Sequence, residues 1–140
     1  QQPPAAGAPV SARSPAASQR TLDNGLRVIV ASNRALPLIA ADLRVASGSS
    51  ADAAGRAGVA GLTADLLTRG TQTRSATEIA REIESLGAGI GAGAGLDSSS
   101  VSINTRTDRA EEAFTIFADV VRNPAFADEE LDPASNRWTA

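Results

Sequence analysis

The stretch GRAGVAGLTADLLTRGT, residues 55–71, decides the fold that this sequence predicts. Apolar residues recur in it at helical spacing, and Gly70 stands where a glycine often follows the last turn of a helix. The pattern predicts a short amphipathic helix with an apolar stripe on one side and a polar side opposite. The stripe consists of Val59, Leu62, Leu66 and Leu67.

The composition limits the chemistry that the chain can perform. Its 140 residues are 42% hydrophobic and 21% charged, as in globular proteins with one core. There is no cysteine and no histidine, which excludes disulfides, cysteine-ligated metals, the commonest zinc ligand and a Ser-His-Asp triad. The arginines are spread along the whole chain, so no nucleic-acid partner is expected. No apolar run approaches the roughly 20 residues of a membrane span, so none is expected.

Composition also divides the chain into three segments. Residues 1–19 are rich in proline, alanine and serine without a period, which predicts a flexible leader. Residues 20–132 are expected to form one domain, and residues 133–140, with Trp138, an atypical tail. The leader fits an exported protein whose signal peptide has been removed, and an ordinary disordered N-terminus is the less favoured alternative.

The first part of the domain predicts strands. Asn24-Gly25 is typical of a tight hairpin turn, because this pair accepts positive φ angles, and alternating residues follow it. After Pro37 a second strand is expected, with Asp42 and Arg44 on its polar face. Its apolar face consists of Ile39, Ala41, Leu43 and Val45.

Further helices flank another strand. Ser75 and Glu78 match a capping box, so a helix is expected from Ser75 to Gly87. Its apolar stripe consists of Ile79, Ile83 and Leu86, and its solvent-facing charges of Glu78, Glu82 and Glu84. Residues 97–106 predict a strand whose inward face consists of Val101, Ile103 and Thr105.

The last helices complete the predicted fold. Asp108 is expected to cap a helix that ends at Asn123-Pro124, and Asp128 to begin a final one that Pro133 would interrupt. The core face of the longer helix consists of Phe114, Phe117 and Val121. Strands joined by short turns beside such helices favour an α+β fold, an antiparallel sheet with helices packed on one face.

Several short motifs, taken together in their order and spacing, resemble the N-terminal half-domain of the pitrilysin/insulinase family of zinc metallopeptidases. The resemblance covers about residues 22–131. The motifs are LDNGLRVIV at residues 22–30, Gly58-Val59-Ala60, Thr68-Arg69-Gly70-Thr71, Arg74-Ser75-Ala76, ESLGA at residues 84–88 and VRNPAF at residues 121–126.

The resemblance implies a lost metal site. In active members a helix carries H-x-x-E-H, whose histidines bind zinc while the glutamate acts as general base. The matching positions here are Gly61, Ala64 and Asp65, and the further glutamate ligand falls near Ala134. One carboxylate beside a glycine and an alanine is not a zinc site, so we expect no catalytic residue, metal or cofactor, and we expect Asp65 to be a solvated helix carboxylate. The serines at 98–100 have no base partner either.

The resemblance also suggests a role. The family contains subunits that keep the architecture, lose the metal and pair with an active, zinc-bearing metallopeptidase subunit. This chain most resembles the bacterial kind, which favours a periplasmic or secreted heterodimer and makes the chain part of a longer two-domain subunit or one with an atypical end. The alternative is a structural or assembly module of the same fold with no role in proteolysis.

Residues 87–95, GAGIGAGAG, have a glycine at every odd position. A phosphate-binding loop is not expected, because a helix precedes the glycines and a strand follows. The alternation predicts a strand with one bare face, which lets a helix or another backbone approach closely. The resemblance adds a further hypothesis, since the matching edge strand of active relatives pairs with extended substrate. It predicts peptide contact at Gly91, Ala92 and Gly93.

Overall fold

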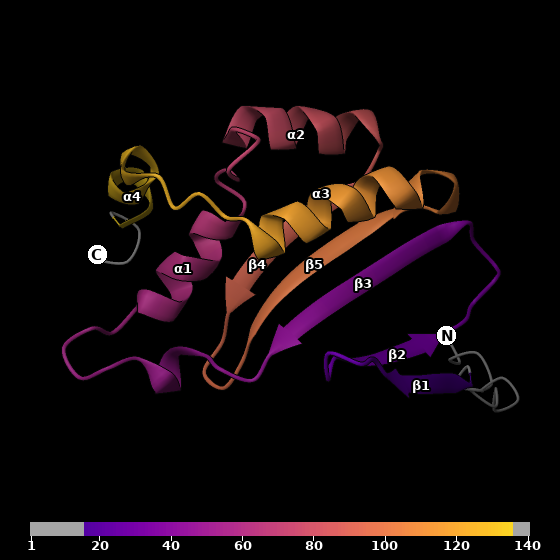
Figure 1. Cartoon of the computed structure of the whole chain (residues 1–140), viewed down its shortest axis with the longest axis horizontal. Helices are drawn as coiled ribbons and strands as arrows, with labels where there is room; N and C mark the ends of the chain where they lie inside the picture. Colours follow the sequence, from indigo (N-terminus) through magenta and orange to yellow (C-terminus); the bar gives the residue numbers. More distant parts are fainter. Residues whose placement is uncertain (1–15, 136–140) are drawn as a thin grey trace, which may run out of the picture. The chain divides into compact units, whose positions relative to one another are not determined.

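A β-hairpin forms around the predicted Asn24-Gly25 turn. Strands β1 (Ala17–Thr21) and β2 (Arg27–Ala31) pair antiparallel (Figure 1). The backbone N–H of Gly25 donates to the carbonyl of Leu22 at 2.9 Å, and Gly25 is the residue of this turn with a positive φ, of 84°. The hairpin prediction is confirmed, and the glycine supplies the left-handed conformation that closes it.

The structure is a computed structural model that describes residues 16–135. The chain divides between Leu36 and Pro37 into two compact units, of which the hairpin belongs to the first. Pairing in β1 begins at Ala17, inside the segment that composition marks as a leader. Residues 1–15 and the predicted tail residue Trp138 lie outside the described residues. Within residues 16–135, no helix has the length and apolar character needed to cross a membrane.

The second unit is built on a three-stranded antiparallel sheet. The strand order is β3 (Leu38–Val45), β5 (Ser99–Arg106), β4 (Gly89–Ala94), so β3 and β4 are its edges. Alternate residues of β3 are half-buried, as predicted for a strand with one solvated face. In the register, Val101 of β5 lies opposite Leu43 on one side and Ala92 on the other.

Helices cover one face of this sheet. Helix α2 (Ala76–Ser85) and helix α3 (Ala110–Arg122) lie over it, and α1 (Val59–Leu67) lies against β4 (Figure 1). The α+β fold, an antiparallel sheet with helices on one face, is confirmed. The buried core between the layers consists of Ile79, Ile83, Val101, Ile103, Ala113, Ile116 and Val120.

Helix α2 begins with the predicted capping box. The Ser75 hydroxyl accepts the N–H of Glu78 at 3.3 Å, and the Glu78 carboxylate accepts the N–H of Ser75 at 2.8 Å. These hydrogen bonds from the Ser75 backbone and hydroxyl lower the pKa of Glu78 below its ordinary value. The helix ends before Gly87, which has a φ of 60°. Both ends of α2 are therefore set by local sequence.

The predicted start of α3 is wrong. Asp108 does not cap the helix; it lies in the short 3-10 turn η2 (Thr107–Arg109), where Arg106 holds its two carboxylate oxygens at 3.0 and 2.7 Å. Phe114, Phe117 and Val121 pack against the core as predicted but are half-buried, and the two phenyl rings meet edge to face at 5.9 Å. The fully buried positions of the helix are Ala113, Ile116 and Val120.

The last helix is longer than predicted. Helix α4 spans Asp128–Ser135 and continues through Pro133. Proline removes one backbone N–H donor, but near the end of a short helix few intrahelical bonds remain to be lost. The prediction that Pro133 interrupts this helix is therefore wrong.

The loop before α1 is packed backbone to backbone on the β4–β5 turn. Its short 3-10 helix η1 (Ser49–Ala51) starts with the N–H of Ser49 bonded to the carbonyl of Gly95 at 2.9 Å. Gly48 is buried there, and a Cβ on it would lie 2.6 Å from the carbonyl oxygen of Leu96 and 2.7 Å from the nitrogen of Ser98. Only glycine fits this contact without a backbone shift.

A hydrogen-bonded network around Asp119 ties the turn between α1 and α2 to α3. Its carboxylate accepts the hydroxyls of Thr71 at 2.7 Å and Thr73 at 3.1 Å, the guanidinium of Arg74 at 2.6 Å and the amide of Asn123 at 2.8 Å. The Asn123 amide is the largest contribution, followed by Thr71 and Arg74; together they lower the pKa of Asp119 to about 2 against the opposing effect of burial.

We expect Asp119→Asn to lower the free energy of unfolding by about 2 kcal/mol at neutral pH, the equivalent of its lowered pKa. Because the folded-state pKa is the lower one, this stabilisation is present above about pH 4 and disappears as the pH falls toward 2. Urea unfolding as a function of pH measures both. The control, Glu82→Gln, removes the other carboxylate that pairs with Arg74. Because the Glu82 side chain is 46% exposed, this variant should lower the free energy of unfolding by less than about 1 kcal/mol. Equal losses in the two variants would contradict the network.

A second prediction compares two glycines. Gly48→Ala should destabilise the fold by about 1 to 3 kcal/mol, because the methyl group overlaps three backbone atoms that cannot move independently. Gly93→Ala should change stability by no more than about 0.5 kcal/mol, because no atom lies within 4 Å of its Cβ position. Thermal unfolding of both variants measures the difference, and a neutral Gly48→Ala would show that the loop is loosely packed.

Candidate functional site

Helix α1 positions the candidate site, and a carboxylate from the preceding loop fixes where it starts. Gly58 precedes the helix with a φ of 94° and has no side chain to cap it. Asp52 takes this role, since its carboxylate accepts the N–H of Gly58 at 2.9 Å and that of Ala60 at 3.0 Å. These N–H groups at a helix start favour a negative charge, so Asp52 stabilises the first turn.

The three positions that match the zinc motif do not form a polar side of α1. Gly61 is buried, Ala64 is 2% exposed and Asp65 is half-buried. The apolar stripe is shifted too, since Val59 is 47% exposed and Leu62 only half-buried. The predicted orientation is therefore wrong in part: Leu66 of the predicted stripe is buried at 4% exposure, but Gly61 and Ala64 also pack inward, where small side chains allow close approach to neighbouring elements.

These residues do not fit a zinc ion. A zinc site needs at least three converging nitrogen, sulfur or oxygen ligands, and here only Asp65 has a side-chain donor atom. Ala134, matched to the further ligand, lies in α4 and has none. Among residues 16–135 no group of three or more histidines, cysteines, aspartates or glutamates could hold a metal. No metal-assisted step is assigned to this chain.

A pocket of about 360 Å³ opens beside α1. We call it the α1 pocket; it lies between the helix, the loop before it and the ends of β3 and β5. Its one carboxylate, Asp52, accepts two backbone N–H groups and so has a structural role at the start of α1. The walls include Val45, Thr63, Leu67, Ser99 and Val101. The serine at 99 donates to the carbonyl of Ser47 at 2.8 Å, and no activated nucleophile results.

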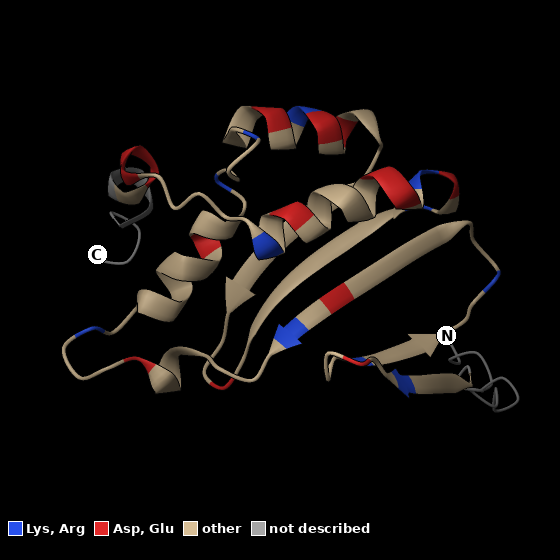
Figure 2. Cartoon of the chain, viewed as in Figure 1, with Lys and Arg blue, Asp and Glu red and all other residues tan. Residues whose placement is uncertain are grey.

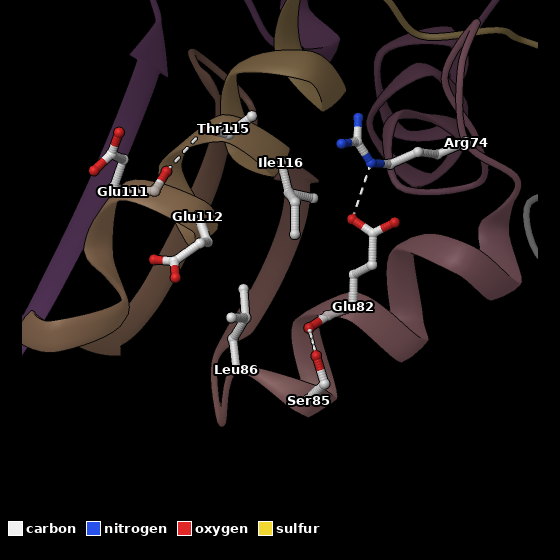
Figure 3. A pocket seen from close by; sticks show the side chains of 8 residues that line it. All are labelled: Arg74, Glu82, Ser85, Leu86, Glu111, Glu112, Thr115 and Ile116. Carbon is white, nitrogen blue, oxygen red and sulfur yellow. Dashed lines mark hydrogen bonds and ion pairs between the residues drawn. The ribbon is translucent and has the colours of Figure 1, made fainter.

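A second pocket, of about 470 Å³, lies between α2 and α3 (Figure 3). Glu82 on α2 borders it, together with Glu111 and Glu112 on α3. Its two hydroxyls, of Ser85 and Thr115, donate to backbone carbonyls of their own helices at 2.7 and 2.9 Å. The pocket therefore offers carboxylates and two hydroxyls that are already hydrogen-bonded to the backbone. No hydroxyl in it is paired with a side chain that could act as its general base.

Acidic residues are frequent on the helices, as Figure 2 shows for α2, α3 and α4. Two of those predicted to face solvent have structural roles. Glu82 binds the guanidinium of Arg74 at 3.0 Å, and Glu78 completes the capping box. Hydrogen bonds to Glu82, and then to Asp119, raise the pKa of Arg74. The prediction of a solvent-facing charge is confirmed for Glu78, which is exposed, whereas Glu82 is half-buried and paired with Arg74.

Strand β4 carries the residues predicted to contact peptide. Gly91 lies opposite Ser102 and Ala92 opposite Val101, and β4 is an edge of the described sheet. Ala92 faces the core, whereas Gly91 and Gly93 face the other side of the sheet. Of the atoms that the structure describes, only the Ser102 hydroxyl, beside Gly91, lies within 4 Å of a Cβ built at these two positions. The close backbone approach predicted for residues 87–95 is found instead at Gly95, whose carbonyl accepts the N–H of Ser49 at 2.9 Å.

Sequence patterns did not reveal Asp52 as the cap of α1 or Asp119 as the centre of a network. Asp52 lies six residues before the first N–H that it binds, outside the spacing of a capping box. Asp119 has polar neighbours that join it only through the fold, 45 to 48 residues apart. Its one local partner, Asn123, follows it by four residues, a spacing that places both side chains on the same helix face. This spacing was the only sequence signal that could have indicated the Asp119 network.

The sequence is similar to members of one protein family. The insulinase family (peptidase family M16) matches residues 27–139. An uncharacterized zinc protease of Rickettsia bellii is 31% identical over 110 residues, which cover 79% of this chain and 27% of that protein. Subunit 1 of the mitochondrial cytochrome b-c1 complex of Caenorhabditis elegans is 27% identical over 123 residues, covering 88% of this chain and 26% of that protein.

Solved structures agree. The chain superposes on a peptidase M16 inactive domain from Pseudomonas fluorescens with a TM-score of 0.82 and 32% identity, over 87% of this chain and 30% of that one. A protease from Helicobacter pylori has the same fold, with a TM-score of 0.78 at 22% identity, over 89% of this chain and 31% of that one. The chain thus spans less than a third of these relatives. It belongs to the insulinase family, peptidase family M16, and corresponds to the N-terminal domain of that family.

Proposed function

We propose that this chain is a catalytically silent M16 domain, part of a non-catalytic subunit that assists an active zinc metallopeptidase in peptide degradation. One observation carries the proposal: the chain has no histidine or cysteine, and the residues that the family resemblance matches to the zinc motif are Gly61, Ala64 and Asp65. The burial of Gly61 and Ala64 supports it, because these positions now pack the helix. The relative from Pseudomonas fluorescens, described as an inactive domain, also supports it.

In this proposal zinc is held only by the partner subunit, and this chain contributes surface. The edge strand β4 would supply backbone N–H and C=O groups to an extended peptide, around Gly91, Ala92 and Gly93. A periplasmic or secreted location belongs to the same proposal; cell fractionation that finds the chain in the cytoplasm alone would contradict it.

A structural or assembly module is the second candidate. The similarity to a cytochrome b-c1 complex subunit favours it, since that relative is named for a complex and not for a peptidase. Affinity purification of the tagged protein from its native cell separates the candidates. A stoichiometric partner with an H-x-x-E-H motif supports the peptidase pair, whereas a complex without one supports the assembly module.

Purified alone, the chain should retain well under one zinc per molecule after dialysis and should not hydrolyse peptides in a chelator-sensitive way, because three converging ligands are lacking. Elemental analysis and a quenched-fluorescence peptide assay measure this. The R. bellii relative, prepared in parallel, tests whether the assay conditions support an M16 enzyme. Stoichiometric zinc together with chelator-sensitive hydrolysis by this chain alone would overturn the proposal.

Peptide binding to β4 should depend on main-chain groups. We expect an extended peptide that binds the chain to bind about tenfold more weakly when alternate backbone nitrogens are methylated, because strand addition uses those donors. Methylating the other set of nitrogens, which face away from the sheet edge, is the matched control. Calorimetry measures both, and equal affinities for the two methylated peptides would show that binding does not use a strand edge.

A further inference from the structure

We propose that Asn24 is a site of spontaneous deamidation that the β1–β2 hairpin gates, and that its isoaspartyl product holds the hairpin open. The proposal rests on the turn between β1 and β2 and is independent of the peptidase role. Asn24 and Gly25 are both exposed at the tip of the hairpin. An asparagine followed by glycine is the sequence most open to this reaction, because no side chain hinders attack by the glycine nitrogen.

The reaction needs only water and a base. The backbone nitrogen of Gly25 loses its proton and attacks Cγ of Asn24; the bond from Cγ to the amide nitrogen breaks, and ammonia leaves. This forms a five-membered succinimide. Water then opens the ring at either carbonyl. One opening gives aspartate, and the other gives isoaspartate, in which the main chain runs through the former side chain.

In the closed turn, both reacting groups are held by hydrogen bonds. The nucleophile, the N–H of Gly25, donates to the carbonyl of Leu22 at 2.9 Å. The Asn24 side-chain oxygen accepts the N–H of Leu26 at 3.1 Å, which holds the amide toward the following residues. Attack therefore requires the Gly25 nitrogen to leave Leu22 and the Asn24 side chain to rotate. The closed hairpin slows the reaction, and only the opened turn reacts.

The hairpin has little to keep it closed. It is a two-stranded ribbon, a structure that is marginally stable in water without further strands. Ile29 is 59% exposed and Val30 51% exposed, so its apolar side chains are poorly buried. Among the described residues, one side-chain hydrogen bond joins the two strands. It runs from the Ser18 hydroxyl to the carbonyl of Val30, and its length of 3.5 Å is at the upper limit for a hydrogen bond. Opening is therefore frequent enough for the modification to accumulate.

The two products affect the hairpin differently. Aspartate at position 24 still offers an oxygen to the N–H of Leu26, so the turn can close again. Isoaspartate adds one main-chain carbon between positions 24 and 25. This displaces the Gly25 nitrogen from Leu22 and shifts the pairing of Thr21 with Arg27 next to the turn. Because the ammonia is lost, asparagine is not re-formed, and since isoaspartate closes back to the succinimide only slowly, it makes a transient opening long-lived.

The chain provides its own control. Trypsin cleavage at Arg20, Arg27 and Arg34 releases TLDNGLR and VIVASNR, each with one asparagine. In the second peptide Asn33 is also exposed and accepts the N–H of Ala35 at 3.1 Å, but arginine follows it instead of glycine. The full chain is incubated at mildly alkaline pH, and mass spectrometry follows the exchange of the amide for a hydroxyl in both peptides. Isoaspartyl methyltransferase labelling identifies isoaspartate.

We expect Asn24 to convert and Asn33 to stay intact, with the chain reacting about fivefold to fiftyfold more slowly than synthetic TLDNGLR, as gating by a marginal hairpin requires. No conversion while the free peptide reacts completely, or a rate equal to that of the free peptide, overturns the gating. Conversion of Asn33 at the same rate overturns the site. Hydrogen exchange tests whether isoaspartate holds the hairpin open. The backbone amides of β1 and β2 should exchange at least about tenfold faster in the isoaspartyl chain than in the Asn24→Asp variant. Equal exchange rates would show that isoaspartate does not open the hairpin.

Discussion

The carboxylate of Asp119 is the interaction on which the arrangement of the second unit most depends. It binds the turn that joins α1 to α2, through Thr71 and Arg74, while it stands on α3 and also binds Asn123 at the end of that helix. Bridges between Gly70 and Ser75 and between Thr71 and Pro124 reinforce the same junction. The end of α1, the start of α2 and the exit of α3 are therefore fixed together.

The retention of α1 follows from the same physical terms. Its start is stabilised by Asp52, whose carboxylate satisfies two N–H groups of the first turn. The helix packs against β4. One of its small residues, Ala64, also lines the α1 pocket and is almost fully buried. Neither term involves a metal ligand. The position of α1 in this insulinase-family domain is therefore explained by capping and packing alone.

Local patterns predicted those features whose cause lies within a few residues. The Asn24-Gly25 turn, the Ser75–Glu78 capping box and the alternation of β5 all formed, because each depends on neighbouring backbone geometry. Asp108 failed because Arg106 competes for its carboxylate. The inward turn of Gly61 and Ala64 could not be predicted either, because it depends on which elements pack beside α1 and how closely. The absence of histidine was visible in the sequence, whereas the burial of Gly61 and Ala64 was not.

The two edges of the sheet differ in a way that bears on peptide binding. Strand β3 carries Asp42 and Arg44 on its exposed face, paired at 2.9 Å, and charges on an edge strand oppose pairing with another chain. Strand β4 has no charged residue; glycine and alanine make up its length apart from Ile90. Because bare residues leave the main chain accessible and add no repulsion, β4 is the edge better suited to accept a strand. This asymmetry supports β4 as the peptide-binding edge in the proposed peptidase pair, and it requires no catalytic residue in this chain.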